Sequence, residues 1–254
     1  MDHAQWNNMI LSSLGVLSAI IIITLACKQK TAAARRKLFV FLFLNIAALA
    51  FWALYLLAPT VLPLFTERNV DRHFFSWMIP TASFSSLNPF FIITIGPLLS
   101  YLWLHLTKNN VNVSTPAKFA VGLVLMGAGY LVLTPGIHFH NAMGLVLMFW
   151  LVIAYFFQTV GELFLSPIGL SMVGSLCPRE HEGLMMGVWQ LTTGISGVFT
   201  EYLSRMVDTS KGISPAVTNP LYSHMFSRCG SVTVVVGIIT FLMVPWLKRA
   251  VAPR

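Results

Sequence analysis

A polar stripe runs along one of the most apolar segments of the chain. Gln158, Glu162 and Ser166 follow one another at four-residue intervals within FFQTVGELFLSPIGLSMVGSLCP, residues 156–178. Residues four apart lie on one face of a helix. A carboxylate inside a bilayer costs roughly 2.5–3.5 kcal/mol on insertion scales, so it normally faces a cavity or a partner. We therefore expect Glu162 to lie near mid-membrane and to mark a substrate or proton site; the alternative is a buried pairing that only holds helices together.

A second polar position directly precedes a proline. In SFSSLNPFFIITIGP, residues 83–97, Asn88 stands before Pro89. Proline removes a helical hydrogen bond and disturbs the turn before it, which frees backbone carbonyls near Ser85. A helix that is broken at membrane depth usually lines a cavity. The pattern predicts either such a cavity or a kink whose freed groups are satisfied by the neighbouring serines.

Two tryptophans lie well inside apolar runs, away from the interfacial belt where tryptophan usually gathers. Trp52 and Trp189 are each either a wall of an apolar pocket or, more commonly, a packing residue. Thr193 follows Trp189 by one helical turn and shares its face. His138 and His140 form an isolated H-x-H with no third ligand nearby, which indicates a solvated loop instead of a zinc site.

The composition indicates the environment of these groups. The chain has 254 residues, of which 56% are hydrophobic and 9% charged, and its mean hydropathy is +0.76. An average soluble domain has roughly one-quarter charged residues. The net charge of +8 comes from Lys and Arg in loops and not from one basic face, which argues against nucleic-acid binding. The sequence predicts an integral membrane protein.

Seven apolar runs are long enough to cross a bilayer, which takes about 20 residues. The third and fifth contain prolines and should be kinked or tilted. The longest polar connection, residues 206–228, is too short to bury a core of its own. The expected fold class is an all-α membrane protein with about seven transmembrane helices, at roughly 9–27, 38–58, 74–104, 116–134, 142–176, 184–205 and 230–247.

Lysine and arginine in the loops predict the orientation. If the first helix runs from outside to inside, eleven of the sixteen basic residues are cytoplasmic, including the cluster within residues 28–37. This distribution favours an external N-terminus and a cytoplasmic C-terminus. An odd number of helices with an exported, unprocessed N-terminus indicates that the chain works as part of a larger unit.

Several segments resemble the proton-coupled oligopeptide transporters, the POT or PTR family of the major facilitator superfamily. Residues 156–178 look like the tenth helix of that family, with its G-E-L-x-x-S-P core intact. The resemblance covers roughly residues 37–247, and its motifs occur in the family's order. Three further segments are similar to the seventh helix with its following loop, the eighth helix and the start of the eleventh, namely FWALYLLAPTVLPLFTERNVDR, SFSSLNPFFIITIGPLLSYLW and EGLMMGVWQLTTG.

The resemblance implies that the chain corresponds to the C-terminal half of such a transporter in a bacterial inner membrane. Residues 37–254 would form the C-terminal six-helix bundle. Residues 1–36 would form the second of the two extra helices that bacterial members carry between their halves, with a basic cytoplasmic loop. The E-x-x-E-R-F-x-Y-Y motif and the coupling lysine of the N-terminal half do not occur in the sequence. A separate N-terminal half-transporter is therefore the expected partner.

The resemblance also assigns the site residues. It implies that Glu162 and Asn88 hold the amino terminus of a di- or tripeptide. A carboxylate and an amide oxygen together can satisfy an ammonium group that has left water. The proton would be the coupling ion, with no cofactor or metal. The peptide pocket would be lined by Trp52, Trp189, Ser166 and Thr193, the last standing where the family often has a serine.

Two functions remain open at this point. The first is proton-driven uptake of di- and tripeptides together with an N-terminal half. The second is a transport-inactive remnant, because Leu56 stands where the family usually has an acidic gating residue. The sequence disfavours an intramembrane enzyme, since no nucleophile, base and orienting group can be assembled from the spans.

Overall fold

Within residues 3–111, 113–207 and 214–251, which the computed structural model describes, the chain is almost entirely helical. The long helices are α1 (His3–Lys28), α2 (Ala32–Asn69), α4 (Leu87–Lys108), α5 (Thr115–Leu131), α7 (Met148–Leu176), α8 (Glu182–Arg205) and α9 (Pro215–Leu242). The short helices are α3 (Thr81–Ser85), α6 (Leu133–His138), α10 (Val244–Val251) and the 3-10 turn η1 (Arg179–His181). The strands are β1 (Val70–Asp71), β2 (His73–Phe74), β3 (Trp77–Met78) and β4 (Val146–Leu147).

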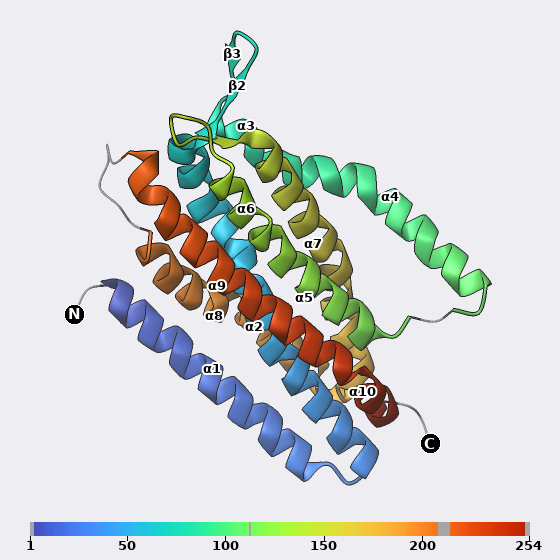
Figure 1. Cartoon of the computed structure of the whole chain (residues 1–254). Coiled ribbons are helices and arrows are strands. Elements are labelled where there is room, and N and C mark those ends of the chain that lie inside the picture. Colours follow the sequence, from blue (N-terminus) through green and yellow to red (C-terminus); the bar gives the residue numbers. More distant parts are fainter. Residues whose placement is uncertain (1–2, 112, 208–213, 252–254) are drawn as a thin grey trace.

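The central bundle consists of α2, α5, α7, α8 and α9, which supply most of the buried side chains (Figure 1). Helix α1 lies along one edge and packs against α2 and α8. Helix α4 leans outward at the opposite edge, packs against α7 and buries none of its side chains. Residues 29–31 separate α1 from α2, close to the predicted boundary after residue 36; the division into two domains stays a prediction.

Six helices in the described part of the chain are long and apolar enough to cross a membrane, which confirms the fold class. They comprise α1, α2, α3 with α4, α5 with α6, α7 and α9. Helix α8 is also long, with 24 residues, but carries more polar side chains. It packs along α2 in the bundle, and the span predicted at residues 184–205 stays a prediction.

Close helix contacts hold α5 between α7 and α9. A Cβ atom on Gly127 of α5 would lie 2.6 Å from the carbonyl oxygen of Gly230 on α9. One on Gly161 of α7 would lie 2.8 Å from the carbonyl oxygen of Gly122 on α5. Backbones approach this closely only where the side chain is absent, as is common in membrane helix packing.

Hydroxyl groups on one face of α8 tie that helix to α2. They recur every four residues, so they form a row along α8. Each hydroxyl also lies within 3.1 Å of the carbonyl oxygen four residues earlier in its own helix, so its single proton is shared between that carbonyl and the acceptor on α2. The interhelical bonds are Thr192 to Asn45 Oδ1 at 2.9 Å, Ser196 to the carbonyl of Leu49 at 3.3 Å and Thr200 to the carbonyl of Ala53 at 2.9 Å.

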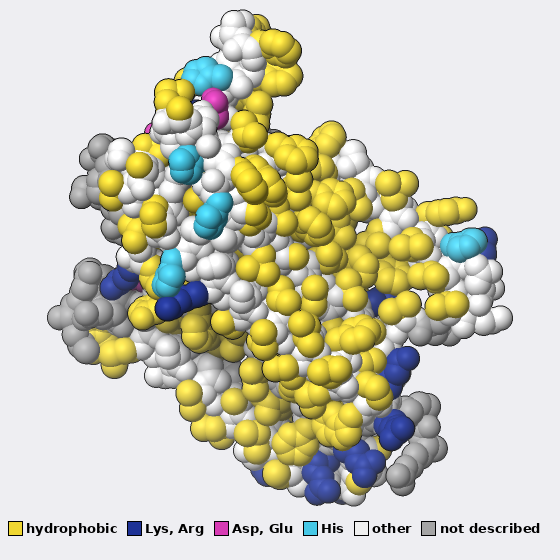
Figure 2. All heavy atoms as spheres, viewed as in Figure 1, with side chains coloured by type: hydrophobic (Ala, Val, Ile, Leu, Met, Phe, Trp, Pro, Cys, Tyr) yellow, Lys and Arg dark blue, Asp and Glu magenta, His cyan; other side chains and the backbone are white. Residues whose placement is uncertain are grey.

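The two ends of the bundle differ in character. We call the end that carries the β2–β3 hairpin the hairpin end, and the opposite end, where α2 begins and α10 lies, the basic end (Figure 1). Figure 2 shows most of the visible lysine and arginine side chains at the basic end, most of the visible histidines on the side of the hairpin end, and hydrophobic side chains over the middle. This distribution is that of a membrane-embedded bundle with two aqueous ends.

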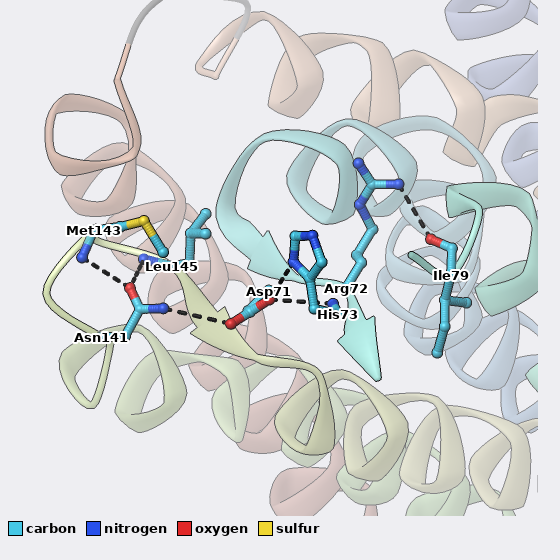
Figure 3. Close-up of polar contacts among 7 residues, drawn as sticks. All are labelled: Asp71, Arg72, His73, Ile79, Asn141, Met143 and Leu145. Atoms are coloured by element: carbon cyan, nitrogen blue, oxygen red, sulfur yellow. Dashed lines mark hydrogen bonds and ion pairs between the residues drawn. The ribbon is translucent and has the colours of Figure 1, made fainter. Parts of the chain in front are cut away.

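Polar contacts order the connections at the hairpin end (Figure 3). Asp71 accepts hydrogen bonds from the backbone N–H of His73 at 3.1 Å and from the amide of Asn141 at 3.5 Å. The oxygen of Asn141 accepts the N–H groups of Met143 and Leu145, each at 3.0 Å. The backbone bond from His73 is the main cause that lowers the pKa of Asp71. These bonds accompany the parallel pairing of β1 with β4.

The predicted third span, residues 74–104, begins too early. Its first residues form the β2–β3 hairpin, and the helical part starts at Thr81 and extends to Lys108. The span was predicted to start too early because the hairpin contains several aromatic side chains, which are hydrophobic. Phe75 at its tip is 91% exposed and Trp77 is 79% exposed, so their hydrophobicity reflects no burial inside this chain.

The predicted polar connection, residues 206–228, is also largely wrong, because α9 already begins at Pro215. Its first turns contain the polar residues Thr218 and Asn219, both buried. Asn69 at the end of α2 donates to Thr218 Oγ1 at 2.6 Å and to Asn219 Oδ1 at 2.8 Å. These side chains are polar because they pair with one another, which hydropathy along the sequence does not reveal.

Candidate functional site

Three helices converge on the carboxylate of Glu162. Asn88 on α4 donates its amide N–H to Glu162 Oε2 at 2.8 Å, and Tyr55 on α2 donates its hydroxyl to Oε1 at 3.1 Å. Asn88 also donates to Thr159 Oγ1, one turn earlier on α7, at 3.2 Å. Glu162 is half-buried, so its charge is compensated by hydrogen bonds while one side stays accessible. The carboxylate is therefore a potential binding group and not only a structural link.

The break between α3 and α4 places Asn88 at this position. Helix α3 ends at Ser85 and α4 starts at Leu87, which confirms the interruption predicted before Pro89. Pro89 is the third residue of α4, where a helix has no partner for its backbone N–H in any case. Asn88 thus lies in the first turn of α4, facing α7.

A pocket of about 180 Å³ opens beside this group. Tyr55 and Asn88, both bonded to Glu162, form part of its wall. Gln158, one turn before Glu162 on α7, also lines it and is 4% exposed. Among the described residues, the amide nitrogen of Gln158 has no hydrogen-bond partner, although buried polar groups are normally paired. Further wall residues are Ala58, Pro59, Ser85 and Tyr155.

The other predicted pocket residues differ in how they relate to Glu162. The ring of Trp52 meets that of Tyr55 edge to face, with 5.3 Å between centroids. Its buried indole N–H has no partner in the part of the chain that the structure describes, so Trp52 offers a second free donor near the site. Ser166 is half-buried one turn beyond Glu162 on α7, and Thr193 is half-buried on α8. Among the described residues, no hydrogen bond joins Ser166 or Thr193 to Glu162, so their roles stay predictions.

Trp189 is a packing residue in this structure. Its side chain is 2% exposed and lies against Gly169 of α7, where a Cβ atom would overlap the indole ring. The ring of Phe119 on α5 lies 6.4 Å away between centroids. This placement fits the packing alternative, and the role of Trp189 as a pocket wall stays a prediction.

Sequence reasoning missed Tyr55, Thr159 and Tyr155. Tyr55 follows Trp52 by three residues, so the two share a face of α2, and this spacing was a usable signal. The contacts of Thr159 and Tyr155 depend on how α4 meets α7 and give no signal of their own in the sequence.

His138 and His140 are both exposed, as expected of a solvated position. His138 ends α6 and does not lie in a loop, and its Nδ1 lies 2.8 Å from the carbonyl oxygen of Thr134.

Long apolar helices around a half-buried, hydrogen-bonded carboxylate are the features of a membrane transport protein. The family model described as "POT family" matches residues 1–219. The chain therefore belongs to the POT family. The match includes α1, which carries no recognisable motif.

Curated relatives agree with this assignment. The chain is 34% identical over 253 residues to dipeptide and tripeptide permease B of Yersinia enterocolitica, covering 99% of this chain and 51% of the relative. It is 35% identical over 252 residues to dipeptide and tripeptide permease A of Chromobacterium violaceum, covering 98% and 50%. The chain thus spans about half the length of the curated relatives it matches.

Solved structures of the same family share the fold. A mutant of the peptide transporter POT in complex with alafosfalin superposes with a TM-score of 0.80 at 28% identity, covering 96% of this chain and 49% of the other. A POT family transporter in complex with 5-aminolevulinic acid gives a TM-score of 0.82 at 26% identity, covering 98% and 49%.

Proposed function

We propose that the chain forms the C-terminal half of a proton-driven di- and tripeptide symporter and contributes the site for the peptide amino terminus. The observation that carries this proposal is the convergence of Asn88 and Tyr55, both of which line a pocket, on the carboxylate of Glu162. The names of the curated relatives, dipeptide and tripeptide permeases, support the substrate class.

The arrangement suits an ammonium group. Glu162 supplies two carboxylate oxygens, and Asn88 uses its nitrogen for Glu162 and Thr159, which leaves its carbonyl oxygen as a further acceptor. Charge-assisted hydrogen bonds are roughly twice as strong as neutral ones. The surrounding apolar helices lower the local dielectric, which strengthens the attraction between an ammonium group and the carboxylate.

Transport needs a second bundle in this proposal. Alternating access in such transporters rests on two bundles that rock around a site at the midplane. This chain spans about half of its relatives, and a separate N-terminal half would supply the opposite wall and the coupling groups. The proton is the coupling ion. The complex would lie in the bacterial inner membrane, with the hairpin end outside and the basic end in the cytoplasm.

One observation favours the second function, a transport-inactive remnant. Leu56, next to Tyr55 on α2, stands where the family resemblance leads us to expect an acidic gating residue. A leucine carries no charge, so the corresponding contact with the other half cannot form.

Proteoliposome uptake distinguishes the two functions. The chain is reconstituted alone and together with the N-terminal half of the Yersinia enterocolitica permease, and uptake of radiolabelled dialanine is measured under an inward proton gradient. We expect accumulation only when both halves are present. Uptake that stays at the level of empty liposomes with both halves would favour the remnant, whereas robust uptake by the chain alone would contradict the need for a partner.

A further inference from the structure

A second cavity, unrelated to Glu162, lies between α2, α8 and α9. It is an open groove of about 400 Å³. The small side chains of Ala50 and Ala53 on α2 leave the space, and Leu49, Phe199 and Val232 border it. Tyr55 and the other groups bonded to Glu162 do not line it. The groove therefore belongs to a different face of the bundle from the proposed peptide site.

The threonine hydroxyl that lines the groove is already hydrogen-bonded within its own helix. The hydroxyl of Thr233, which lines it, donates to the carbonyl of Cys229 in the same helix at 3.0 Å. An apolar groove of this kind does not hold ordered water. In a membrane-embedded bundle the medium that fills such a space is hydrocarbon.

A single charged side chain stands at the groove. Arg228 lines it on α9, is exposed, and makes no hydrogen bond or ion pair within the described ranges 3–111, 113–207 and 214–251. The following residues on α9 and α10, 229–247, contain no charged side chain. On α8, Tyr202 also lines the groove, and it is flanked by the ion pair of Glu201 and Arg205. Charged groups on both helices place this mouth at the membrane surface nearer the hairpin end.

We propose that this groove binds an anionic phospholipid, with an acyl chain along α2 and α9 and the phosphate on Arg228. The guanidinium supplies positive charge and forked N–H donors that match a phosphate. Tyr202, on α8, also lines the groove and is 71% exposed, so its side chain is open to the surroundings of the protein. The site requires only that the bundle is in a membrane, so it is independent of peptide transport.

Native mass spectrometry of the full chain tests the role of the charge. The protein is purified in detergent, incubated with dioleoylphosphatidylglycerol or dioleoylphosphatidylcholine, and the bound lipid is counted. We expect wild type to retain phosphatidylglycerol in preference, and Arg228→Gln to bind it about fivefold more weakly, since one basic residue near a lipid surface contributes about 1 kcal/mol. Lys108→Gln, on exposed α4, is the matched control and should bind as wild type does.

Filling the groove tests the acyl-chain site separately. Val232 lines the groove and is 60% exposed, so Val232→Trp occupies the space without disturbing the core. Ile239, on the same helix and 48% exposed, does not line it, and Ile239→Trp is the control. We expect severalfold loss of bound phosphatidylglycerol only in Val232→Trp. Equal lipid retention by wild type, Arg228→Gln and Val232→Trp would overturn the proposal.

Discussion

The amide of Asn88 on α4 donates to the carboxylate of Glu162 on α7 over 2.8 Å, and this bond joins the most exposed long helix to the bundle. The remaining links between the two helices include an edge-to-face contact of Phe91 with Phe156. A ligand that binds Glu162 would therefore lie next to the hydrogen bond between Asn88 and Glu162 that links α4 to α7.

Replacement of Asn88 by alanine removes one of the two donors to Glu162 and one proposed acceptor for the peptide. Hydrogen bonds to charged groups contribute about 1.5–3 kcal/mol, so dipeptide affinity should fall about 10- to 100-fold. Binding of radiolabelled dialanine to membranes that contain both halves measures this change. Thr94→Ala is the control, because the hydroxyl of Thr94 bonds only carbonyls of its own helix. Equal losses in both variants would point to a general defect of α4.

Replacement of Tyr55 by phenylalanine tests the second donor. The change keeps the ring that packs against Trp52 and removes only the hydroxyl 3.1 Å from Glu162. We expect about a tenfold loss of dialanine affinity with little change in thermal stability. Tyr101→Phe, at a position 71% exposed on α4, should have no effect. Unchanged affinity in Tyr55→Phe would exclude the hydroxyl from the site.

The polar pairing between α2 and α8 should contribute to stability. Thr192→Val keeps the side-chain shape but leaves the buried oxygen of Asn45 without its 2.9 Å donor. An unsatisfied buried group costs about 1–3 kcal/mol, so the midpoint of thermal unfolding in detergent should fall. The exposed Thr107→Val on α4 serves as the comparison. A midpoint no lower than that of the comparison would show that the pairing contributes nothing.

Glycine contacts give a prediction with opposite signs at two positions. A Cβ on Gly127 would meet the carbonyl oxygen of Gly230 at 2.6 Å, so Gly127→Ala must push α5 away from α9 and lower the unfolding midpoint. A Cβ on Gly187 of α8 would meet no atom within 4 Å among the described residues. Gly187→Ala should therefore raise stability slightly, by up to about 1 kcal/mol from helix propensity. Stabilisation by Gly127→Ala would contradict the close packing.

Asp71 should make stability depend on pH in the acid range. Its pKa is lowered in the folded protein, mainly by the backbone N–H of His73. Its contribution is therefore complete above the unfolded pKa near 3.9 and is lost as pH falls through the lower folded pKa. The midpoint of wild type should fall more than that of Asp71→Asn between pH 6 and pH 3. Parallel curves for the two proteins would refute this role.

The features that could be predicted from the sequence are those that depend on residue type and local spacing alone. The stripe of Gln158 and Glu162 faces the protein as expected, because a polar side chain in an apolar run must find a partner. The break before Pro89 is equally local, since proline disrupts the turn that precedes it. The contact of Asn88 with Glu162, by contrast, was expected only through the family resemblance.

Other features depended on partners far apart in the chain. The start of α9 was missed because Asn219 looks like a loop residue until Asn69 is placed beside it. Tyr55 was missed because a tyrosine in an apolar run reads as packing unless its acceptor is known. Trp189, like Trp52, lies well inside an apolar run, and only the structure shows that Trp189 packs on Gly169 whereas Trp52 contacts Tyr55 beside the pocket.

The central claim is that Glu162 binds the peptide amino terminus. The most direct measurement compares dialanine binding by wild type, Glu162→Gln and Glu180→Gln in membranes that contain both halves. Glu180 lies exposed in η1, so its variant makes the same chemical change away from the pocket. The account predicts that Glu162→Gln loses measurable binding while Glu180→Gln binds as wild type does. Dialanine affinity that is unchanged in Glu162→Gln would contradict it.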